Sequence, residues 1–475
     1  MSDTNGLEIE RAHRVFALQQ RAATALPTPD LAWRRTRLRA LIDALRTHQD
    51  AIVTAVSADF GGRAESETRF IELMGPILQA RHAMTDLRHW MQPRRRRTEL
   101  LFITNSAWVE YHPKGVVGVI GAWNYPLYLS LGPTIAALAA GNRVMVKMPE
   151  LVPRTTELLK RVLAERFPED EVAVFGGDLA MAEAFGAIPF NHLVFTGSPR
   201  VGRQVMRAAS ANLTPVTLEL GGKSPALIGP KANLVDAAIR IAHGKTFNAG
   251  QTCVAPDYVM VPRGQGESFA MSVIAATQRL YPSGPADAGY TSIVSERHAT
   301  RLQTLIDDAA AKGAKVMRDD PHRKRTERQM PLHVLVGASP DMRVMQEEIF
   351  GPILPVFEYD RLNDALDHVR KGERPLALYT FGLDQRDERL VLDSVQAGGV
   401  TIDDWGWHVM QHDLPFGGIG NSGMGTYHGE EGFRELSHAR SVFKRNRWFP
   451  MGLFYPPYGN IVQRLALRFY LGRRK

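Results

Sequence analysis

The sequence contains a single cysteine, Cys253, among its 475 residues. One thiol excludes an intramolecular disulfide and every metal or iron–sulfur site that requires several cysteine ligands. A lone cysteine is either a small buried hydrophobe or a reactive thiol. The remaining composition, 44% hydrophobic and 23% charged, is that of a globular protein. At about 150 residues per domain, this length predicts two to four domains.

The N-terminal end lacks an apolar leader, and the C-terminal end lacks acidic residues. The first residues include Asp3 and Glu8 and no apolar core of a secretory signal, so we expect a cytoplasmic protein. From Lys444 onward the chain carries eight Lys and Arg and no Asp or Glu, whereas the rest has zero net charge. This basic tail, with an amphipathic helix predicted over 460–471, would lie peripherally on the anionic inner membrane surface or cover a partner subunit.

The longest uncharged stretch, residues 115–142, has the length of a membrane span. Its glycines and prolines would break a spanning helix. We interpret it as a strand over 115–121, a loop over 122–132 and a helix over 133–140 that begins at Pro133.

Apolar runs and helical patterns alternate along most of the remaining chain. Strands are predicted at 144–146, 172–174, 192–195 and near 257–262, helices at 155–166, from Pro199, at 234–248 and at 297–312, and a further strand–helix–strand set at 353–401. Uninterrupted apolar strands between helices indicate parallel sheets covered on both faces, so the sequence predicts an α/β fold with two doubly wound units. Residues 1–90 are expected to be largely helical and to pack on the first sheet.

Three side chains suit acyl chemistry. Cys253 lies in the polar, glycine-containing segment Asn248–Pro256, where a thiolate would be a strong nucleophile. Glu219 is the one carboxylate of an apolar strand that two glycines close, and there it can serve as a general base. Asn124 follows a buried strand, and its amide can donate to a developing oxyanion. A turn-forming role for Asn124 is the alternative.

Two further segments suit a dinucleotide. In Phe195–Gly202 a strand leads into a helix with Ser198 as N-cap and Pro199 as first helical residue, and the free N–H groups there can bind a pyrophosphate. The segment is neither a P-loop nor a G-x-G-x-x-G motif. Lys147 and Glu150 close an earlier strand and offer a cation and an acceptor for a ribose.

Six motifs occur in the order found in the aldehyde dehydrogenase superfamily, and the resemblance covers about residues 111–440. They are Trp123-Asn124-Tyr125-Pro126, Phe195-Thr196-Gly197-Ser198, Glu219-Leu220-Gly221-Gly222-Lys223-Ser224-Pro225, Gly250-Gln251-Thr252-Cys253, Glu347-Glu348-Ile349-Phe350-Gly351-Pro352 and Leu414-Pro415-Phe416-Gly417-Gly418. The segment 421–429 is similar to the class 3 branch, which includes fatty and coniferyl aldehyde dehydrogenases.

The resemblance implies an aldehyde dehydrogenase-like fold, with two doubly wound α/β domains and a small bridging β element. The implied parts are a Rossmann-type dinucleotide-binding domain (1–93 and 113–221), a catalytic thiol domain (222–412), strands that bridge the subunits of a homodimer (94–112 and 433–445) and the basic amphipathic tail (446–475). No nucleic-acid-binding module accompanies the arginine run at 94–97, so we expect no nucleic-acid partner.

The resemblance also implies a role for each site residue. Cys253 would be the nucleophile, Glu219 the base, and Asn124 with the Cys253 backbone N–H the oxyanion hole. The residues implied in cofactor binding are Lys147, Glu150, Gly197, Ser198, Gly202, Glu348 and Phe350. We expect NAD as the cofactor, with NADP as the alternative, because Glu150 would repel a 2′-phosphate.

Aromatic and histidine side chains provide weaker signals. Tyr125 and Phe416 are candidates for lining an apolar substrate tunnel, and ordinary core packing is the alternative; Trp405 and Trp407 are read as core aromatics. His408 and His412 are spaced like metal ligands, but no third ligand motif accompanies them. We interpret both as loop residues near the substrate entrance and expect no metal.

The expected function is NAD(P)-dependent oxidation of apolar aldehydes, either aromatic or medium- to long-chain aliphatic, to carboxylic acids. The reaction would pass through a thiohemiacetal and a thioester on Cys253. A catalytically silent structural or binding member of the fold and a coenzyme A-acylating enzyme are the alternatives. The intact Cys253, Glu219 and Asn124 disfavour the first, and the base Glu219 favours water over coenzyme A.

Overall fold

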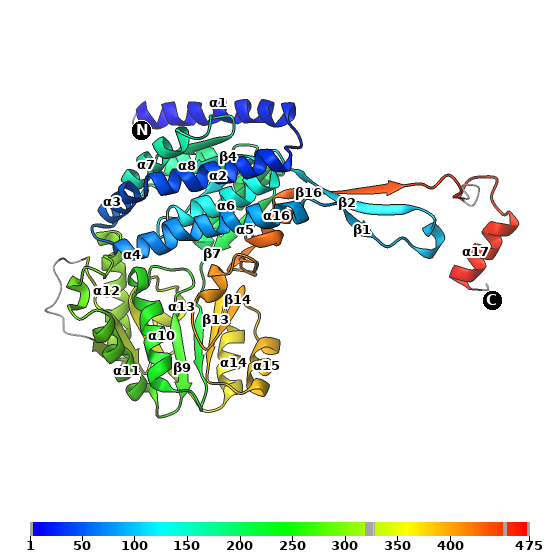
Figure 1. The fold of residues 1–475 in the computed structure, drawn as a ribbon. Helices are drawn as coiled ribbons and strands as arrows, with labels where there is room; N and C mark the ends of the chain where they lie inside the picture. Colours follow the sequence, from blue (N-terminus) through cyan, green and yellow to red (C-terminus); the bar gives the residue numbers. More distant parts are fainter. Residues whose placement is uncertain (1–2, 319–325, 327, 450–453, 473–475) are drawn as a thin grey trace. The chain divides into compact units, whose positions relative to one another are not determined.

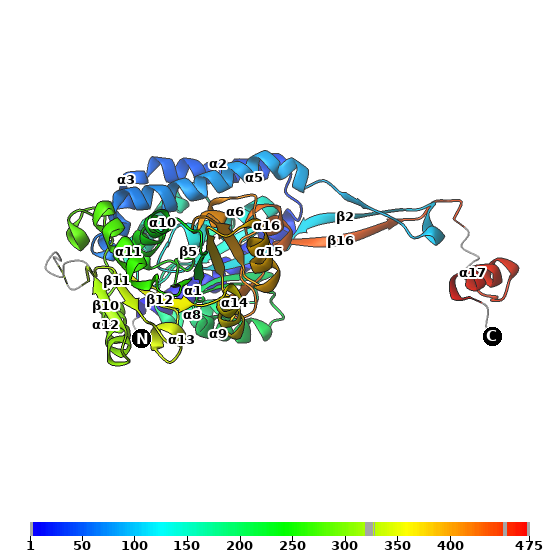
Figure 2. The ribbon, with the colours of Figure 1, turned by 90° about the horizontal axis from the view of Figure 1, so that it is seen from below.

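The computed structural model describes residues 3–318, 326, 328–449 and 454–472. It divides into two units, one made of Met1–Trp90 and Pro113–Ser437 and a smaller one made of Met91–His112 and His438–Lys475. The larger unit contains two sheets, each with its own helices (Figures 1 and 2).

The first sheet has six strands in the order β15-β7-β6-β3-β4-β5. Its strands are β3 (Val116–Ile120), β4 (Arg143–Lys147), β5 (Val172–Phe175), β6 (His192–Gly197), β7 (Val216–Leu220) and β15 (Gly423–Met424). Neighbouring strands are parallel except for β15, which pairs antiparallel with β7. The side chains of β3 and β4 are buried throughout, as expected for a parallel sheet between helical layers.

Helices cover this sheet on both sides. They are α1 (Asp3–Ala25), α2 (Leu31–Thr47), α3 (Gln49–Phe60), α4 (Glu65–Glu67), the π-helix η1 (Thr68–Met74), α5 (Gly75–Trp90), α6 (Tyr128–Ala140), α7 (Pro153–Ala164), α8 (Leu179–Gly186), α9 (Pro199–Ser210) and α16 (Gly429–Glu435). Helix α1 packs on the sheet through Ala12, Val15 and Phe16, and α2 and α5 lie side by side next to α6 (Figure 1). The predicted helical layer over residues 1–90 is confirmed.

The second sheet has seven strands in the order β10-β11-β12-β9-β8-β13-β14. Its strands are β8 (Pro225–Ile228), β9 (Tyr258–Pro262), β10 (Lys315–Arg318), β11 (His333–Val336), β12 (Ile353–Tyr359), β13 (Ala377–Phe381) and β14 (Gly399–Ile402), and its helices include α10 (Leu234–Thr246), α11 (Gly266–Leu280), α12 (Glu296–Ala311), α13 (Arg343–Gln346), α14 (Leu362–Lys371) and α15 (Gln385–Ser394). Only β10 runs antiparallel to its neighbour. The predicted α/β class with two parallel sheets is therefore confirmed.

The predicted start of the helix at Pro133 is wrong. Helix α6 begins at Tyr128, and Pro133 lies inside it. The buried carboxylate of Glu72 accepts hydrogen bonds from the backbone N–H groups of Leu127 (2.9 Å) and Tyr128 (2.8 Å). It thus satisfies N–H groups at the helix start that have no partner within the helix. Because the capping group comes from η1, no residue next to the helix start signals it.

The smaller unit contains β1 (Arg94–Arg96), β2 (Ser106–Pro113) and β16 (Ser437–Lys444) in one sheet, with β1 antiparallel to β2. Phe102 packs against Phe443, Phe449 and Phe454. The predicted tail helix is present as α17 (Ile461–Leu471), capped by Asn460. The last basic residues of the tail, at 473–475, lie outside the described residues. Among the helices that the structure describes, none has the length and apolar character needed to cross a membrane.

Replacing Glu72 with alanine should destabilise the larger unit. Glu72 and Arg63 form an ion pair at 3.1 Å with no exposed side-chain surface, and removing one partner of such a pair costs about 3–5 kcal/mol. We expect Glu72→Ala to lower the melting temperature markedly in differential scanning calorimetry. Glu65→Ala, which removes an exposed carboxylate, is the matched control. Equal melting temperatures for the two variants would contradict the capping role.

Candidate active site

The sequence-predicted site residues of the first sheet gather at one edge. In the strand register, Ile120 pairs with both Lys147 and Phe195, and Thr196 pairs with Glu219. All four parallel strands therefore end at the same edge. Ligands of open α/β sheets bind at this carboxyl edge, so the register alone places Lys147 and Glu219 beside a candidate site.

A strained turn positions Cys253. After α10 the backbone passes through three consecutive left-handed residues, Asn248 (φ 50°), Ala249 (φ 52°) and Gly250 (φ 70°). Side chains other than glycine rarely adopt this region, and strained residues of this kind cluster at functional sites. The sequence does not predict this turn, because non-glycine residues such as Ala249 usually have a negative φ.

Hydrogen bonds from distant segments hold the turn. Glu67 accepts from the Asn248 backbone N–H at 3.0 Å and from the Thr291 hydroxyl at 2.6 Å. The Asn248 amide donates to the carbonyl oxygens of Asn124 and Gln251, each at 3.1 Å. Gln251 in turn donates to the Asn248 carbonyl at 2.9 Å. These bonds join the Cys253 loop to the Asn124 loop and to α4.

The Asn124 side chain contacts the segment that carries Cys253. It is buried, and its side-chain amide donates to the Gln251 carbonyl at 3.1 Å. An amide carries two N–H donors, so one remains for a ligand. The buried Tyr125 hydroxyl lies 2.8 Å from the Thr252 hydroxyl, beside Cys253.

The Cys253 thiol is partly exposed, but its surroundings disfavour the negatively charged thiolate form. Burial, followed by the negative charges of Glu348 and Glu219, raises the pKa of Cys253 to about 12. The thiol is therefore protonated at neutral pH. It reacts as a nucleophile only when a base takes its proton.

Glu219 has the burial and the raised pKa that would suit such a base. Its side chain is buried, and neither carboxyl oxygen has a hydrogen-bond partner among the described residues. Burial raises the pKa of Glu219 well above its usual value. A carboxyl group with a raised pKa is a stronger base, and unpartnered burial of this cost is characteristic of functional sites.

Glu348 packs against Gly221, where any side chain would force neighbouring atoms to move. A Cβ added at Gly221 would lie 2.0 Å from Glu348 Oε2. Burial and the charge of Asp257 raise the pKa of Glu348 to about 8, although the Gly222 N–H donates to it. The nearby Phe350 has a left-handed backbone (φ 54°), and its ring packs against Trp123 with centroids 5.3 Å apart.

The groups predicted to hold a dinucleotide fit that role. The Ser198 hydroxyl accepts from the Val201 N–H at 3.4 Å, which confirms the predicted N-cap and presents the start of α9 at the carboxyl edge. A Cβ at Gly202 would come within 2.7 Å of Leu220, so glycine allows α9 to lie close to β7. Gly197, the last residue of β6, precedes the cap.

Lys147 and Glu150 lie at the end of β4. The Lys147 ammonium donates to the carbonyl oxygens of Met148 (2.7 Å) and Gly177 (3.0 Å), and burial lowers its pKa. Glu150 is exposed. Met148 is buried, and its sulfur accepts from the Ser130 hydroxyl at 3.1 Å.

The remaining aromatic and histidine predictions have mixed outcomes. Phe416 is buried against the rings of Tyr427 and His428. Trp407 is half exposed, so the prediction that it is a core residue is wrong. His408 lies in a 3-10 turn, Trp407–Met410, rather than in a loop. Its Nδ1 lies 2.8 Å from the Thr401 hydroxyl. Within the described part of the chain, no group of three or more His, Cys, Asp or Glu side chains could hold a metal ion.

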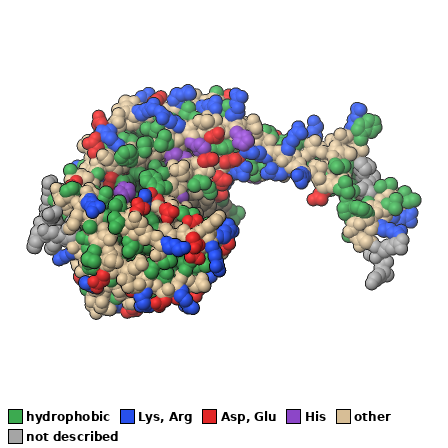
Figure 3. Space-filling view, turned by 60° about the horizontal axis from the view of Figure 1, so that its bottom comes forward, with side chains coloured by type: hydrophobic (Ala, Val, Ile, Leu, Met, Phe, Trp, Pro, Cys, Tyr) green, Lys and Arg blue, Asp and Glu red, His purple; other side chains and the backbone are tan. Residues whose placement is uncertain are grey.

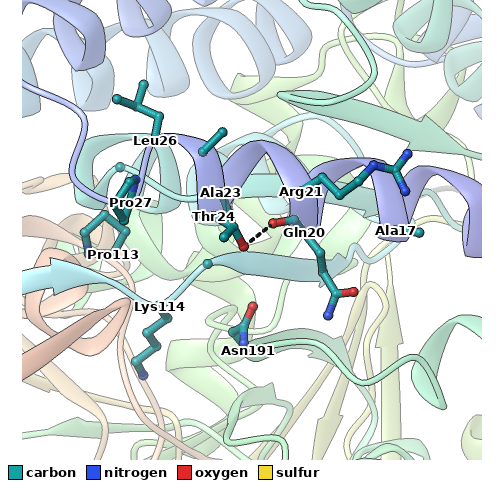
Figure 4. A pocket seen from close by; sticks show the side chains of 13 residues that line it. Ala17, Gln20, Arg21, Ala23, Thr24, Leu26, Pro27, Pro113, Lys114 and Asn191 are labelled. Atoms are coloured by element: carbon teal, nitrogen blue, oxygen red, sulfur yellow. Dashed lines mark hydrogen bonds between the residues drawn. The ribbon is translucent and has the colours of Figure 1, made fainter.

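A pocket of about 880 Å³ lies at the opposite edge of the first sheet (Figure 4). It is bounded by the C-terminal end of α1 and by Lys114, Gly141 and Asn191, which precede strands β3, β4 and β6. None of the predicted site residues lines it.

Comparison with known proteins identifies the class. The profile of the aldehyde dehydrogenase family matches residues 4–442, and the chain belongs to this family. Among its relatives, a probable coniferyl aldehyde dehydrogenase of Pseudomonas aeruginosa is 48% identical over 98% of this chain and 97% of its own length. The coniferyl aldehyde dehydrogenase of Pseudomonas sp. strain HR199 is 41% identical over 92% of this chain and 91% of its own.

A solved structure supports the same assignment. The substrate-bound AldH of Staphylococcus aureus is 32% identical, with a TM-score of 0.90 over 96% of this chain and 99% of that chain. The predicted family, its coniferyl aldehyde dehydrogenase-like branch and the enzyme class, a NAD(P)-dependent aldehyde dehydrogenase, are confirmed.

Neutralising Glu348 should make the thiol easier to ionise. Glu348 is ionised above pH 8, and its negative charge then opposes the thiolate. In Glu348→Gln, the rate at which iodoacetamide alkylates Cys253 should begin to rise at a pH about one unit or more below that of the wild-type protein. The single cysteine makes the readout unambiguous. Glu347→Gln, which removes a partly exposed carboxylate paired with Arg301, is the control, and superimposable profiles would contradict the electrostatic coupling.

Proposed function

We propose that this protein oxidises apolar aldehydes, aromatic ones of the coniferaldehyde type or medium- to long-chain aliphatic ones, to carboxylic acids with NAD. The observation that carries the proposal is the approach of a buried, unpartnered carboxyl group, Glu219, to the protein's one thiol. The names of the Pseudomonas relatives support the aromatic class.

Each of these groups has a role in the proposed reaction, and Glu219 acts in two of its steps. Glu219 takes the proton of Cys253, and the sulfur forms a bond to the aldehyde carbon while the carbonyl electron pair moves to oxygen. The free N–H of the Asn124 amide and the Cys253 backbone N–H stabilise this oxyanion. When bound, NAD accepts the hydride that leaves as the carbonyl bond re-forms. Glu219 then releases its proton to the solvent and deprotonates a water molecule, which attacks the thioester carbon. As the intermediate collapses to the acid, Glu219 returns this second proton to the departing sulfur, which restores the thiol.

The cofactor would lie along the carboxyl edge of the first sheet. Lys147 and Glu150 would bind the adenine ribose, the α9 start at Ser198 the pyrophosphate, and Glu348 the nicotinamide ribose, with Phe350 against the nicotinamide ring. This assigns 1–93 and 113–221 to the dinucleotide and 222–412 to the thiol. The exposed Glu150 carboxylate would repel a 2′-phosphate, which favours NAD over NADP. An NAD-bound aldehyde dehydrogenase of Mycobacterium tuberculosis, 27% identical with a TM-score of 0.80, supports the cofactor class.

The smaller unit would make contacts outside the catalytic core. The strands at 94–112 and 433–445 would bridge two copies of the chain in a cytoplasmic homodimer. Helix α17 exposes most of its apolar side chains, among them Leu465, Phe469 and Leu471. With 11 residues it is shorter than the roughly 20 that a membrane span needs, so it would cover a partner subunit or lie on an anionic membrane surface.

Two substitutions separate the steps of the reaction. Cys253→Ala should abolish turnover and still bind NAD, measured by titration calorimetry. Because Glu219 is the proposed base of both steps, Glu219→Gln should slow the attack of Cys253 and should slow hydrolysis of the thioester by about 10²–10⁴-fold, so that a slow initial rise of NADH is followed by a lower steady state. Rapid-mixing NADH absorbance with benzaldehyde, coniferaldehyde and decanal measures both phases. A full steady-state rate in Glu219→Gln would remove Glu219 from its role.

Removing the tail tests the membrane contact. The full chain and a variant truncated after Phe449 would be sedimented with phosphatidylglycerol vesicles and with neutral phosphatidylcholine vesicles. A membrane-binding tail, in which each nearby Lys or Arg contributes about 1 kcal/mol, should pellet the full chain with the anionic vesicles only. Equal pelleting of the two proteins would leave subunit contact as the role of the tail.

A further inference from the structure

Three buried aromatic side chains and two histidines pack together near the thiol. The rings of His412 and His428 lie 5.8 Å apart, Phe416 lies 5.3 Å from His428, and Tyr427 lies 4.8 Å from His428. The Tyr128 hydroxyl lies 3.4 Å from His428 Nε2. We call these five residues the histidine–tyrosine cluster. Figure 3 shows histidine side chains beside hydrophobic ones on the face that it displays.

The topology brings this cluster to the active site. Gly423 is the strand partner of Glu219, and the chain reaches Tyr427 four residues later. Tyr128 begins α6, four residues after Asn124. The charge of Cys253 adds to burial in raising the pKa of both Tyr128 and Tyr427. The cluster therefore lies close to the thiol through Tyr128 and Tyr427, and His412 joins it through His428.

The cluster contains polar atoms that no described residue satisfies. Both ring nitrogens of His412, Nδ1 of His428 and the hydroxyl of Tyr427 are buried without a hydrogen-bond partner in the described structure. His412 is 9% exposed, and His428 and Tyr427 are fully buried. Each unpaired buried group costs about 1–3 kcal/mol. Such a set of groups is maintained where a ligand pairs with it.

Both histidines are neutral at physiological pH. Burial, with a contribution from His82, lowers the pKa of His412 to about 4. Burial and the neighbouring His412 and His408 lower the pKa of His428 to about 3. A neutral imidazole offers one donor and one acceptor. The cluster thus matches a neutral hydroxyl group, which both donates and accepts, rather than an anion.

Resting on the proposed function, we propose that the histidine–tyrosine cluster is a subsite for the phenolic hydroxyl of a para-hydroxylated aromatic aldehyde, with His412 as the residue that selects it. The aldehyde carbon would lie at Cys253, and the aromatic ring would lie between, against the apolar faces of Phe416 and Tyr427. An aliphatic aldehyde would leave the buried nitrogens unpaired. Sites built to bind a hydroxyl group reject analogues that lack it much more strongly than apolar pockets reject a changed methylene.

The test compares two aldehydes that share one skeleton. Coniferaldehyde carries the phenolic hydroxyl, and cinnamaldehyde has no ring oxygen. With the full chain and NAD we expect kcat/KM to favour coniferaldehyde by about tenfold or more. In His412→Phe, which keeps an aromatic ring without nitrogens, this ratio should fall to about one, mainly through a higher KM for coniferaldehyde. His412→Gln, which keeps a donor and an acceptor, should recover part of the ratio.

Controls distinguish a failure of the subsite proposal from a failure of the proposed function. His13→Phe alters an exposed histidine of α1 and should leave the ratio unchanged. If wild-type protein oxidises no aldehyde, the proposed function fails. If it oxidises both and His412→Phe keeps the wild-type ratio, or loses both activities equally, the subsite is overturned while the function stands. Should His412→Phe not fold, the affinities of Cys253→Ala and Cys253→Ala/His412→Leu for ferulate and cinnamate decide. Leucine has neither a donor nor an acceptor, so an equal preference for ferulate in the two proteins would overturn the subsite.

Discussion

The left-handed turn at Asn248–Gly250 is the constraint on which the active site depends. Two of its residues have side chains, and each costs roughly 1–2 kcal/mol in this conformation. The turn persists because Glu67 and Gln251, both buried, bind its backbone from either side. The same bonds link the loops of Cys253 and Asn124. The Cys253 thiol and the Asn124 amide are therefore placed by one network and not by two independent loops.

A second property of the site is the burial of polar atoms that have no hydrogen-bond partner among the described residues. Glu219 and the histidine–tyrosine cluster both keep polar atoms away from water with no protein group to pair them. Such groups lower the stability of the free protein, and a ligand that pairs with them gains correspondingly. For Glu219 the result is a raised pKa, and its charge in turn helps to raise the pKa of the Cys253 thiol. For the cluster the result is discrimination among aldehydes.

Agreement between sequence and structure is closest where the signal is local. The strands β3 to β7, the Ser198 cap and the tail helix lie within a few residues of their predicted bounds, because alternation, capping and charge patterns involve only neighbouring residues. The start of α6 was misplaced because Glu72 caps it from 56 residues away. The family resemblance named Cys253, Glu219 and Asn124 but not Glu67 or His412, which lie outside the matching motifs.

The sequence by itself determined the chemistry that is available: one thiol, one carboxylate in an apolar strand, one amide after a buried strand, and no acid in the tail. These are covalent properties of residue types and need no folding. Only the tertiary structure decided which polar groups lose water and which gain a partner. Those outcomes depend on contacts between residues hundreds of positions apart, such as Tyr128 with His428, and they set the pKa of the thiol and the neutrality of the histidines.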